Sequence, residues 1–463
     1  MTTTKTSNIP ASENKMGTMP VPKLLVSMSL PMMISMLVQA LYNIVDSMFV
    51  AQISEDALTA VSLAFPIQTL MIAVASGTGV GINALLSRNL GEKNFDGAND
   101  AARNGLFLGI ISCIAFAILG GFGPHYFFAI QTGNQNIVNY GTQYLTIITV
   151  CSAGIFLQIT FERLMQSTGK TFYNMITQGL GAIINIILDP IMIFGLFGFP
   201  RLEVAGAALA TITGQTVAVC LSFFFNITKN KEISLNMRGF RPHGQTIALI
   251  YEVGIPSIIM QAITSVMTFG MNKILLPFSS TAAAVFGVYY KLQSFIFMPV
   301  FGLNNGMIPI IAYNYGARHK KRITQTAKLS VLIAICIMMI GLLIFQTSSG
   351  FLLHNLFDAS DHMLEIGVPA FRIISLSFLF AGYCIIVGSV FQALGNGVYS
   401  LIVSVARQLL VILPVAYIFA HCFGLSMVWW AIPIAEIVSF LLSTILLIRI
   451  YRQKIEPLQS VDA

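Results

Sequence analysis

Two residues one helical turn apart, Asn185 and Asp189, carry the clearest chemistry in this sequence. Both lie in a long apolar stretch, and Pro190 follows directly. Residues four apart share a helix face, so the amide and the carboxylate can converge on one proton or cation. The proline also removes the hydrogen-bond donor for the carbonyl of Ile186, which frees a further oxygen. This set of oxygens predicts a site for a proton or a small hard cation.

A second polar face lies in the first apolar stretch and ends in an acid. Its members recur at helical spacing and are Gln39, Tyr42, Asn43 and Asp46. A carboxylate in a bilayer is costly, so Asp46 is a functional candidate by default. The other three residues are candidates for the wall of a substrate cavity.

A third acid, Glu162, shares a helix face with Gln158. It stands beside Arg163 near one end of its apolar stretch, and two interpretations stay open: a coupling carboxylate, or half of an interfacial ion pair. Gln158 and, in the next stretch, Gln178 are further candidates for the substrate cavity. Thr211 opens a shorter polar stripe in the following stretch.

The second half of the chain holds different charges in its apolar stretches. The acid there is Glu436, and the bases are Lys273, Lys291, Arg372 and Arg407. One interpretation is that a base pairs with Glu436 and only stabilises the structure. The other is that the bases face a cavity and change partners between states.

The elements that must carry these residues are membrane-spanning helices. Hydrophobic residues make up 56% of the 463-residue chain and charged residues only 9%, whereas soluble domains carry roughly 25% charged residues. A helical span needs about 20 mostly apolar residues. We expect twelve spans, near residues 24–52, 57–84, 100–123, 137–164, 171–196, 203–228, 246–276, 281–312, 323–346, 362–393, 398–420 and 425–450.

The Lys and Arg residues predict how these spans are oriented. Of 25, 20 lie in the terminal tails and in the breaks near 85–103, 163–170, 229–241 and 318–328. The opposite set of segments holds one, Arg201, and four lie within spans. Positive residues collect on the cytoplasmic side, so we expect both termini to be cytoplasmic. The Lys and Arg residues that give the net charge of +7 are therefore expected in cytoplasmic loops, and the charge does not indicate a nucleic-acid-binding module.

The chain also repeats itself at an offset of about 225 residues. Leu30-Pro31 matches Ile255-Pro256, and Asn89-Leu90-Gly91 matches Asn314-Tyr315-Gly316. Two similar halves with the same orientation imply a parallel repeat about an axis along the membrane normal. We expect a disordered cytoplasmic tail (1–22), an N-terminal six-helix bundle (23–228), a cytoplasmic linker (229–245), a C-terminal six-helix bundle (246–452) and a cytoplasmic tail (453–463).

An ordered set of motifs resembles the multidrug and toxic compound extrusion (MATE) family, in its DinF/MepA-like bacterial branch. The strongest is Asn185-Ile-Ile-Leu-Asp189-Pro190-Ile-Met-Ile-Phe-Gly195, followed by Val204-Ala-Gly-Ala-Ala-Leu-Ala-Thr211. Ser29-Leu-Pro31-Met-Met, Leu41-Tyr-Asn-Ile-Val-Asp46 and Ile311-Ala-Tyr-Asn-Tyr-Gly316 also fit. The resemblance extends from about Lys23 to Arg452.

The resemblance implies two six-helix bundles in a V shape, in the bacterial inner (plasma) membrane. It implies efflux of amphipathic, often cationic molecules by alternating access, driven by inward movement of H⁺ or Na⁺. It assigns cation coupling to Asp46, Asn185, Asp189 and Thr211, and it matches Glu162 to an acid of the same branch. The NorM-like branch has acids in spans seven and ten that this sequence lacks, so a second cation site of that kind is not expected.

The expected partners are small amphipathic molecules and the lipid bilayer, with no nucleic acid, for a protein that acts as a monomer. No cofactor is expected beyond the coupling ion, H⁺ or Na⁺. No metal is expected other than a Na⁺ ion at Asp46, Asn185 and Asp189.

Two other classes of function are alternatives to export. A flippase for a lipid-linked precursor, in the same superfamily, would favour a large cationic cleft, and the four bases of the second half keep it open. A membrane enzyme would need converging Ser, His and Asp residues or metal-ligand spacing within spans. All six His residues lie in or near predicted loops, so we expect no enzymatic activity.

Overall fold

The structure is a computed structural model, and it describes residues 14–357 and 359–458. Across these residues every regular element is a helix. Ten helices are long and apolar enough to cross a membrane, and two bent pairs each meet the same test together. Counting each pair as one span gives the expected twelve, so the all-α polytopic membrane fold is confirmed. The tail residues 1–13 and 459–463 lie outside the described part.

The first half of the chain forms the helices that carry the predicted coupling residues. They are α1 (Lys15–Thr18), α2 (Val21–Ala51), α3 (Glu55–Gly91), α4 (Phe95–Phe122), α5 (Pro124–Gln131), α6 (Gln135–Val150), α7 (Ala153–Ser167), α8 (Thr171–Phe194), η1 (Leu196–Gly198) and α9 (Glu203–Thr228). The hydroxyl of Ser54 accepts a hydrogen bond from the backbone N–H of Ala57, and this N-cap defines the start of α3.

The second half repeats this order with small changes. Its helices are α10 (Gly244–Leu275), α11 (Ser280–Gly316), α12 (Lys320–Phe357), α13 (Asp361–Ser375), α14 (Phe378–Ala393), α15 (Gly397–Val405), η2 (Ala406–Ile412), α16 (Leu413–Cys422), α17 (Leu425–Val428), α18 (Ala431–Ile450) and η3 (Tyr451–Ile455). Ser279 caps α11 as Ser54 caps α3, and these serines stand at the repeat offset.

Two expected spans are not single straight helices. The fourth, expected at 137–164, is the pair α6 and α7 bent by 41°, and the tenth, expected at 362–393, is α13 and α14 bent by 49°. A buried serine stands at each break. The hydroxyl of Ser152 donates to the carbonyl of Cys113, and that of Ser377 donates to the carbonyl of Ile374. Both kinks have a polar cause that hydropathy alone does not show.

Two expected loops and part of one expected tail are helical instead. The breaks near 85–103 and 318–328 shrink to short turns, because α3 runs to Gly91 and α12 begins at Lys320. We expected residues 1–22 to be disordered. From residue 14 onward this segment instead forms α1 and the start of α2, because α1 makes hydrogen bonds to distant parts of the chain.

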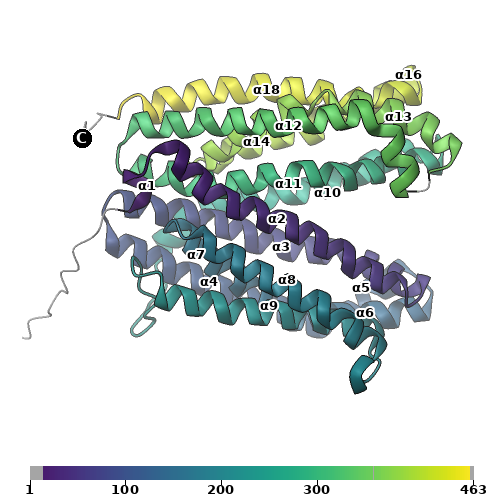
Figure 1. The fold of residues 1–463 in the computed structure, drawn as a ribbon, viewed down its shortest axis with the longest axis horizontal. Coiled ribbons are helices and arrows are strands. Elements are labelled where there is room, and N and C mark those ends of the chain that lie inside the picture. The colour runs from purple at the N-terminus through teal and green to yellow at the C-terminus, as the bar shows by residue number, and fades with distance from the viewer. Residues whose placement is uncertain (1–13, 358, 459–463) are drawn as a thin grey trace, which may run out of the picture.

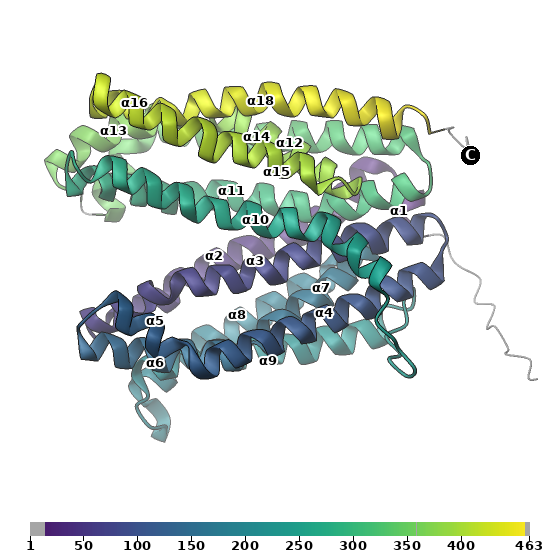
Figure 2. The same cartoon turned by 180° about the vertical axis from the view of Figure 1, so that it is seen from behind.

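The two halves form two groups of helices that lie side by side (Figure 1, Figure 2). They come closest at one end, which carries α1, the α3–α4 turn and the connection 229–243, and they diverge toward the other. We call the end where the two halves come closest the basic end, since the predicted cytoplasmic Lys and Arg residues lie there. One buried apolar cluster runs through the second half and includes Leu25, Leu86 and Leu90 from the first half. A separate cluster fills the first half toward the other end.

Paired glycines show that the halves meet about a pseudo-two-fold axis. A Cβ atom on Gly77 would collide with Ile258, and one on Gly302 would collide with Met33. Both members of each contact stand about 225 residues from their counterparts, the offset found in the sequence. Each half therefore packs its second long helix against the first long helix of the other half, and only glycine permits this close approach.

Candidate cation-binding site

Three helices of the first half bring four of the predicted coupling residues together. The side-chain amide of Asn185 on α8 donates to Asp189 Oδ1 at 3.4 Å and to Thr211 Oγ1 on α9 at 3.3 Å. The carboxyl group of Asp46 on α2 lies within hydrogen-bonding range of the Asp189 carboxyl group. The expected convergence of Asp46, Asn185, Asp189 and Thr211 is thus observed in the geometry.

The oxygens at this cluster are buried and incompletely bonded. Asp189 is fully buried, Asn185 is 3% exposed, and Asp46 is half-buried. One oxygen on each of the three, namely Asp46 Oδ1, Asn185 Oδ1 and Asp189 Oδ2, has no hydrogen-bond partner among the described residues. Buried polar atoms are normally satisfied, so these three oxygens are available to a ligand.

The chemistry of the cluster is that of an ion or proton site. Two carboxylates in hydrogen-bonding range repel each other when both are ionised, unless a proton or a cation lies between them. The donors present are oxygens, which suit H⁺ and hard cations such as Na⁺. No group of three or more His, Cys, Asp or Glu residues in the described chain could hold a metal ion by itself.

Close packing between α8 and α9 sets the position of Asn185 and Asp189. A Cβ atom on Gly214 of α9 would lie 2.6 Å from the carbonyl oxygen of Gly181 and 3.4 Å from Cβ of Asn185. The bare glycine lets α9 approach until Thr211 reaches the Asn185 amide. Pro190 lies inside α8 and cannot donate to the carbonyl of Ile186, so the helix is locally deformable beside the acid.

Two tyrosines line the same region, and the sequence pointed to only one of them. Tyr42, predicted from its place on the α2 polar face, lies close enough to Asp46 and Asp189 to interact with their charges. Tyr144 on α6 does so too, and its hydroxyl accepts a hydrogen bond from Gln68 at 2.9 Å. The signal missed was Gln68, an amide residue in the apolar part of the second span.

The other residues expected in a substrate cavity divide into two groups. Gln39 is half-buried and Asn43 is exposed, both on α2 near the acid cluster. Gln158 and Gln178 instead donate to Glu162, at 3.0 and 2.6 Å. Their donor groups are already engaged at that carboxylate.

Glu162 forms a polar centre of its own, and the ion pair with Arg163 that one interpretation allowed is absent among the described residues. Besides the two glutamines, Thr177 donates to its carboxylate at 3.2 Å. The Arg163 guanidinium turns away and donates to Gln166 and, across the interface, to Asn305 of the second half. The interfacial ion-pair interpretation was wrong, because Glu162 is 3% exposed and is satisfied by neutral donors.

In the second half, Arg407 is the base that pairs with Glu436. The guanidinium Nη1 lies 3.0 Å from Glu436 Oε1, and the two side chains are 25% and 8% exposed. Arg407 stands on η2, a π-helical turn, a form often found at functional sites. Lys291 and Arg372 are exposed and form no ion pair within the described chain. Pairing is therefore the interpretation that the geometry favours for Glu436.

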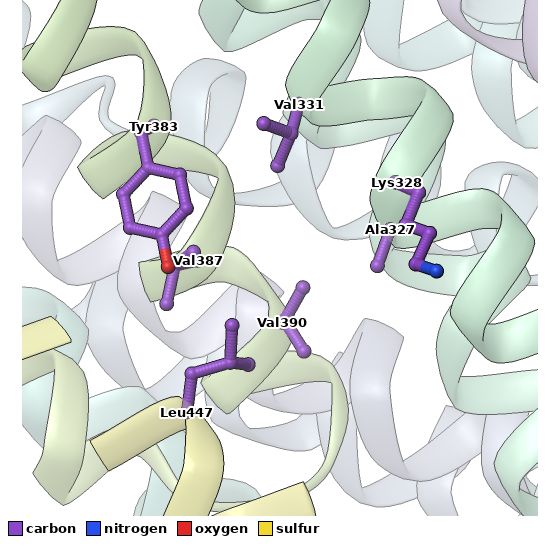
Figure 3. Close-up of a pocket in the computed structure, with 7 residues that line it drawn as sticks. All are labelled: Ala327, Lys328, Val331, Tyr383, Val387, Val390 and Leu447. Atoms are coloured by element: carbon purple, nitrogen blue, oxygen red, sulfur yellow. The ribbon is translucent and has the colours of Figure 1, made fainter. Parts of the chain in front are cut away.

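A pocket of about 240 Å³ lies away from all of these residues, between α12, α14 and α18 (Figure 3). Its walls are mostly apolar, with Val331, Val387 and Leu447 among them, and Lys328 and Tyr383 add polar atoms. The residues that line it include no acid. It is therefore separate from the candidate cation site.

Comparison with known proteins places these features in a family. The MatE family model matches residues 31–191 and again 256–418, so the same model recognises both halves and confirms the internal repeat. The multidrug export protein MepA of Staphylococcus haemolyticus is 28% identical over 422 residues, which cover 91% of this chain and 92% of that relative. A FAD transporter of Shewanella oneidensis is 27% identical over 424 residues, covering 90% and 92%.

Solved structures agree over nearly the whole chain. The outward-facing conformation of a multidrug resistance MATE family transporter of the MOP superfamily has a TM-score of 0.89 at 25% identity and covers 98% of this chain and 100% of that one. A MOP superfamily transporter from Pyrococcus furiosus, described by its reversed binding-pocket polarity, has the same score and identity and covers 99% of each chain. The MatE family model covers well over half of the sequence, and the chain therefore belongs to the MATE family of membrane transporters.

Proposed function

We propose that the protein is a cation-coupled antiporter that exports amphipathic, often cationic small molecules across the bacterial plasma membrane by alternating access. The observation that carries this proposal is the pair of neighbouring carboxyl groups, Asp46 and Asp189. Among the described residues, one oxygen of each lacks a hydrogen-bond partner and no basic residue is bonded to either. Such a pair must take its countercharge from solution, and a H⁺ or Na⁺ ion or a cationic substrate can supply it.

Coupling follows from competition for this charge. With both acids ionised, the pocket attracts a cationic substrate and resists collapse of α2 onto α8. A proton or Na⁺ neutralises the pair, lets the helices repack beside Pro190, and removes the attraction for the substrate. Exchange against a gradient needs only that the two ligands bind the two states with different affinity.

The relatives leave the choice of substrate open, because the name of one refers to multidrug export and that of another to FAD. The half-buried, acidic wall around Asp46 favours organic cations over a dianionic dinucleotide on charge alone. The orientation we propose, with both termini in the cytoplasm, rests on the distribution of Lys and Arg.

The test is transport by purified protein in proteoliposomes, with a pH gradient and a Na⁺ gradient imposed separately and ethidium as the cationic substrate. We expect Asp46→Asn and Asp189→Asn to lose gradient-driven export at least tenfold, and we expect FAD to compete weakly. The gradient that drives export by the parent protein identifies the coupling ion.

The matched control is Glu365→Gln, which removes an acid whose side chain is 83% exposed and remote from the cluster. It should transport like the parent protein. Full gradient-driven export by Asp189→Asn would sink the assignment, whichever ion proves to be coupled.

A further inference from the structure

The short segment before α2 touches both halves of the molecule at the basic end. Asn14 is the N-cap of α1 and holds the backbone N–H of Met16 at 2.9 Å. Six residues, 14–19, then lead into α2. This segment was expected to be disordered, so its order needs a cause outside its own sequence.

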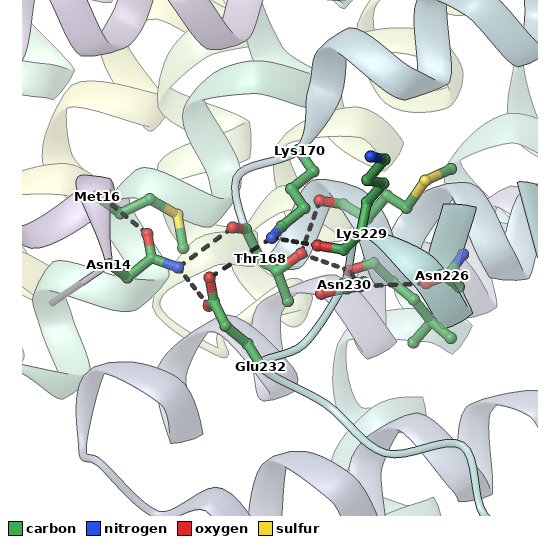
Figure 4. Close-up of polar contacts among 10 residues, drawn as sticks. Asn14, Met16, Thr168, Lys170, Asn226, Lys229, Asn230 and Glu232 are labelled. Carbon is green, nitrogen blue, oxygen red and sulfur yellow. Dashed lines mark hydrogen bonds and ion pairs between the residues drawn. The ribbon is translucent and has the colours of Figure 1, made fainter. Parts of the chain in front are cut away.

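On one side the segment is bonded to the first half. The Asn14 amide donates to the carbonyl oxygen of Thr168 at 3.2 Å and to the carboxylate of Glu232 (Figure 4). Lys170 stands on the same surface and donates to the carbonyl of Lys229 at 2.7 Å. Thr168 ends α7, and Glu232 lies in the connection between the halves.

Lys15 adds an apolar contact on the same side. Its Cε lies 2.9 Å from the position that a Cβ atom would take on Gly169, which has a φ of +84°. Burial and the neighbouring Lys170 lower the pKa of Lys15 from its ordinary value. The stem of this lysine is thus packed on the protein and not extended into water.

On the other side the segment is bonded to the second half. The Asn314 amide of α11 donates to the carbonyl oxygen of Met16 at 3.0 Å. The Arg322 guanidinium of α12 donates to the same oxygen at 2.9 Å and to that of Met19 at 2.7 Å. The Met16 side chain is fully buried in the large apolar cluster.

The lack of a side chain at Gly17 lets the segment lie close to α11. A Cβ atom on Gly17 would lie 3.1 Å from Cε1 of Tyr313. A second hydrogen bond orients the Arg322 guanidinium, because its Nε donates to Asn314 Oδ1 on α11 at 3.0 Å. The receiving surface on the second half is thus held in place before the segment is bound.

We propose that the basic ends of the two bundles together form a binding surface for residues 14–19 of this chain, and that the bound segment clasps this end of the molecule closed. Neither bundle alone supplies both sets of partners. If the halves separate here during alternating access, the segment must leave one of them, so the clasp stabilises the state in which the basic end is shut. This step rests on the proposed alternating access but not on the acid cluster or on the coupling ion.

The test measures access to the interface in purified, detergent-solubilised protein, so it requires no gradient. With the six native cysteines replaced, Ser29→Cys places a reporter at a residue that is 2% exposed and meets Gly306 across the α2–α11 contact. We expect Asn14→Ala and Arg322→Ala each to raise its alkylation rate by a bulky maleimide roughly tenfold, the loss expected for a hydrogen bond to a charged group.

The double variant distinguishes a clasp from two local defects. If the segment is one link, cutting it at both ends opens the interface no further than cutting it at one. Lys231→Ala and Lys321→Ala, which alter exposed neighbours of Glu232 and Arg322, should leave the rate unchanged. Unchanged rates in both single variants, or a double variant whose effect is the product of the two, would overturn the proposal.

A second variant guards against general damage to the protein. Gly17→Val leaves every anchoring side chain in place but pushes the segment away from Tyr313. It should raise the alkylation rate as the anchor variants do, with an unchanged elution volume on size exclusion. Parent-like protection of Ser29→Cys in a folded Gly17→Val protein would contradict the clasp.

Discussion

In each half of the molecule a polar contact joins the last two spans, α8 with α9 in the first half and η2 with α18 in the second. The first contact is between neutral groups, and the second is between an acid and a base. At the repeat offset of about 225 residues, Glu436 on α18 corresponds to Thr211 on α9. Thr211 accepts a hydrogen bond from Asn185, so this contact is neutral, and no base within the described part of the chain pairs with Asp189. Glu436 meets Arg407, so the acid of the second half is neutralised within the protein.

The two halves are thus symmetric in how their helices pack but differ in the polar groups that they hold. The glycine contacts of Gly77 and Gly302, the caps Ser54 and Ser279, and the two bent spans all recur at the offset. Backbone geometry tolerates little change at Gly77 and Gly302, because each of these close approaches joins the two halves. Polar side chains inside each bundle are free to diverge, and an acid that lacks an internal base is left to bind ions from solution.

We expect the largest effect from a variant that gives the first half its own internal base. Thr211→Lys places an ammonium group beside Asp189, where it mimics the Arg407–Glu436 arrangement. A hydrogen-bonded charge pair contributes about 1.5–3 kcal/mol, so coupled export should fall tenfold to a hundredfold in proteoliposomes. Gln215→Lys, one helical turn away, is the control and should retain more activity. Undiminished coupling in Thr211→Lys would mean that free acids at this site are not needed.

The reverse experiment removes the base of the second half. Arg407→Met leaves Glu436 buried without a partner, and a lost partner of this kind costs about 3–5 kcal/mol of the free energy of unfolding. The double variant Arg407→Met with Glu436→Leu should recover most of this loss, because an apolar pair needs no neutralisation. Thermal unfolding in detergent measures both. Equal damage in the single and double variants would show that the charge pair has a role beyond neutralising itself.

We expect a smaller effect from variants at the two glycine contacts that recur in both halves. Gly77→Ala and Gly302→Ala each introduce a Cβ atom into a repeat-related contact, and overpacking of this kind costs about 1–3 kcal/mol. We expect the two variants to lose similar stability in the same melting assay. Gly121→Ala, which meets nothing within 4 Å, should match the parent protein. A large difference between the two glycines would argue against equivalent interfaces.

The smallest expected effect tests the neutral contact itself. Thr211→Val keeps the volume of the side chain but removes the acceptor for the Asn185 amide. Hydrogen bonds between membrane helices average about 0.6 kcal/mol, so the concentration of coupling ion needed for half-maximal export should change about threefold. Thr216→Val, at an exposed position of the same helix where the hydroxyl donates only to the carbonyl of Ile212, is the control and should match the parent protein. A loss as large as that of Asp189→Asn would place Thr211 among the essential ligands.

Much of this molecule could be predicted from its sequence. Apolar stretches gave the spans, the offset between Pro31 and Pro256 gave the repeat, and helical spacing put Asn185 and Asp189 on one face. Most of the failures involve partners on another helix. Ser152 bonds to Cys113, Glu162 accepts from Thr177 and Gln178 as well as from its own helix, and Met16 accepts from Asn314 and Arg322. Periodicity within one helix carries no information about contacts of this kind.

The spans and the acids of the first half could be predicted from the amino-acid order alone, because bilayer length and helical periodicity act locally along the chain. Which polar groups meet depends on how the helices fold against one another. The tertiary structure brought Asp46 to Asp189 from another helix, gave Arg407 rather than Lys291 to Glu436, and joined Met16 to Arg322. These pairings depend on how the helices pack against one another, which no local pattern along the chain specifies.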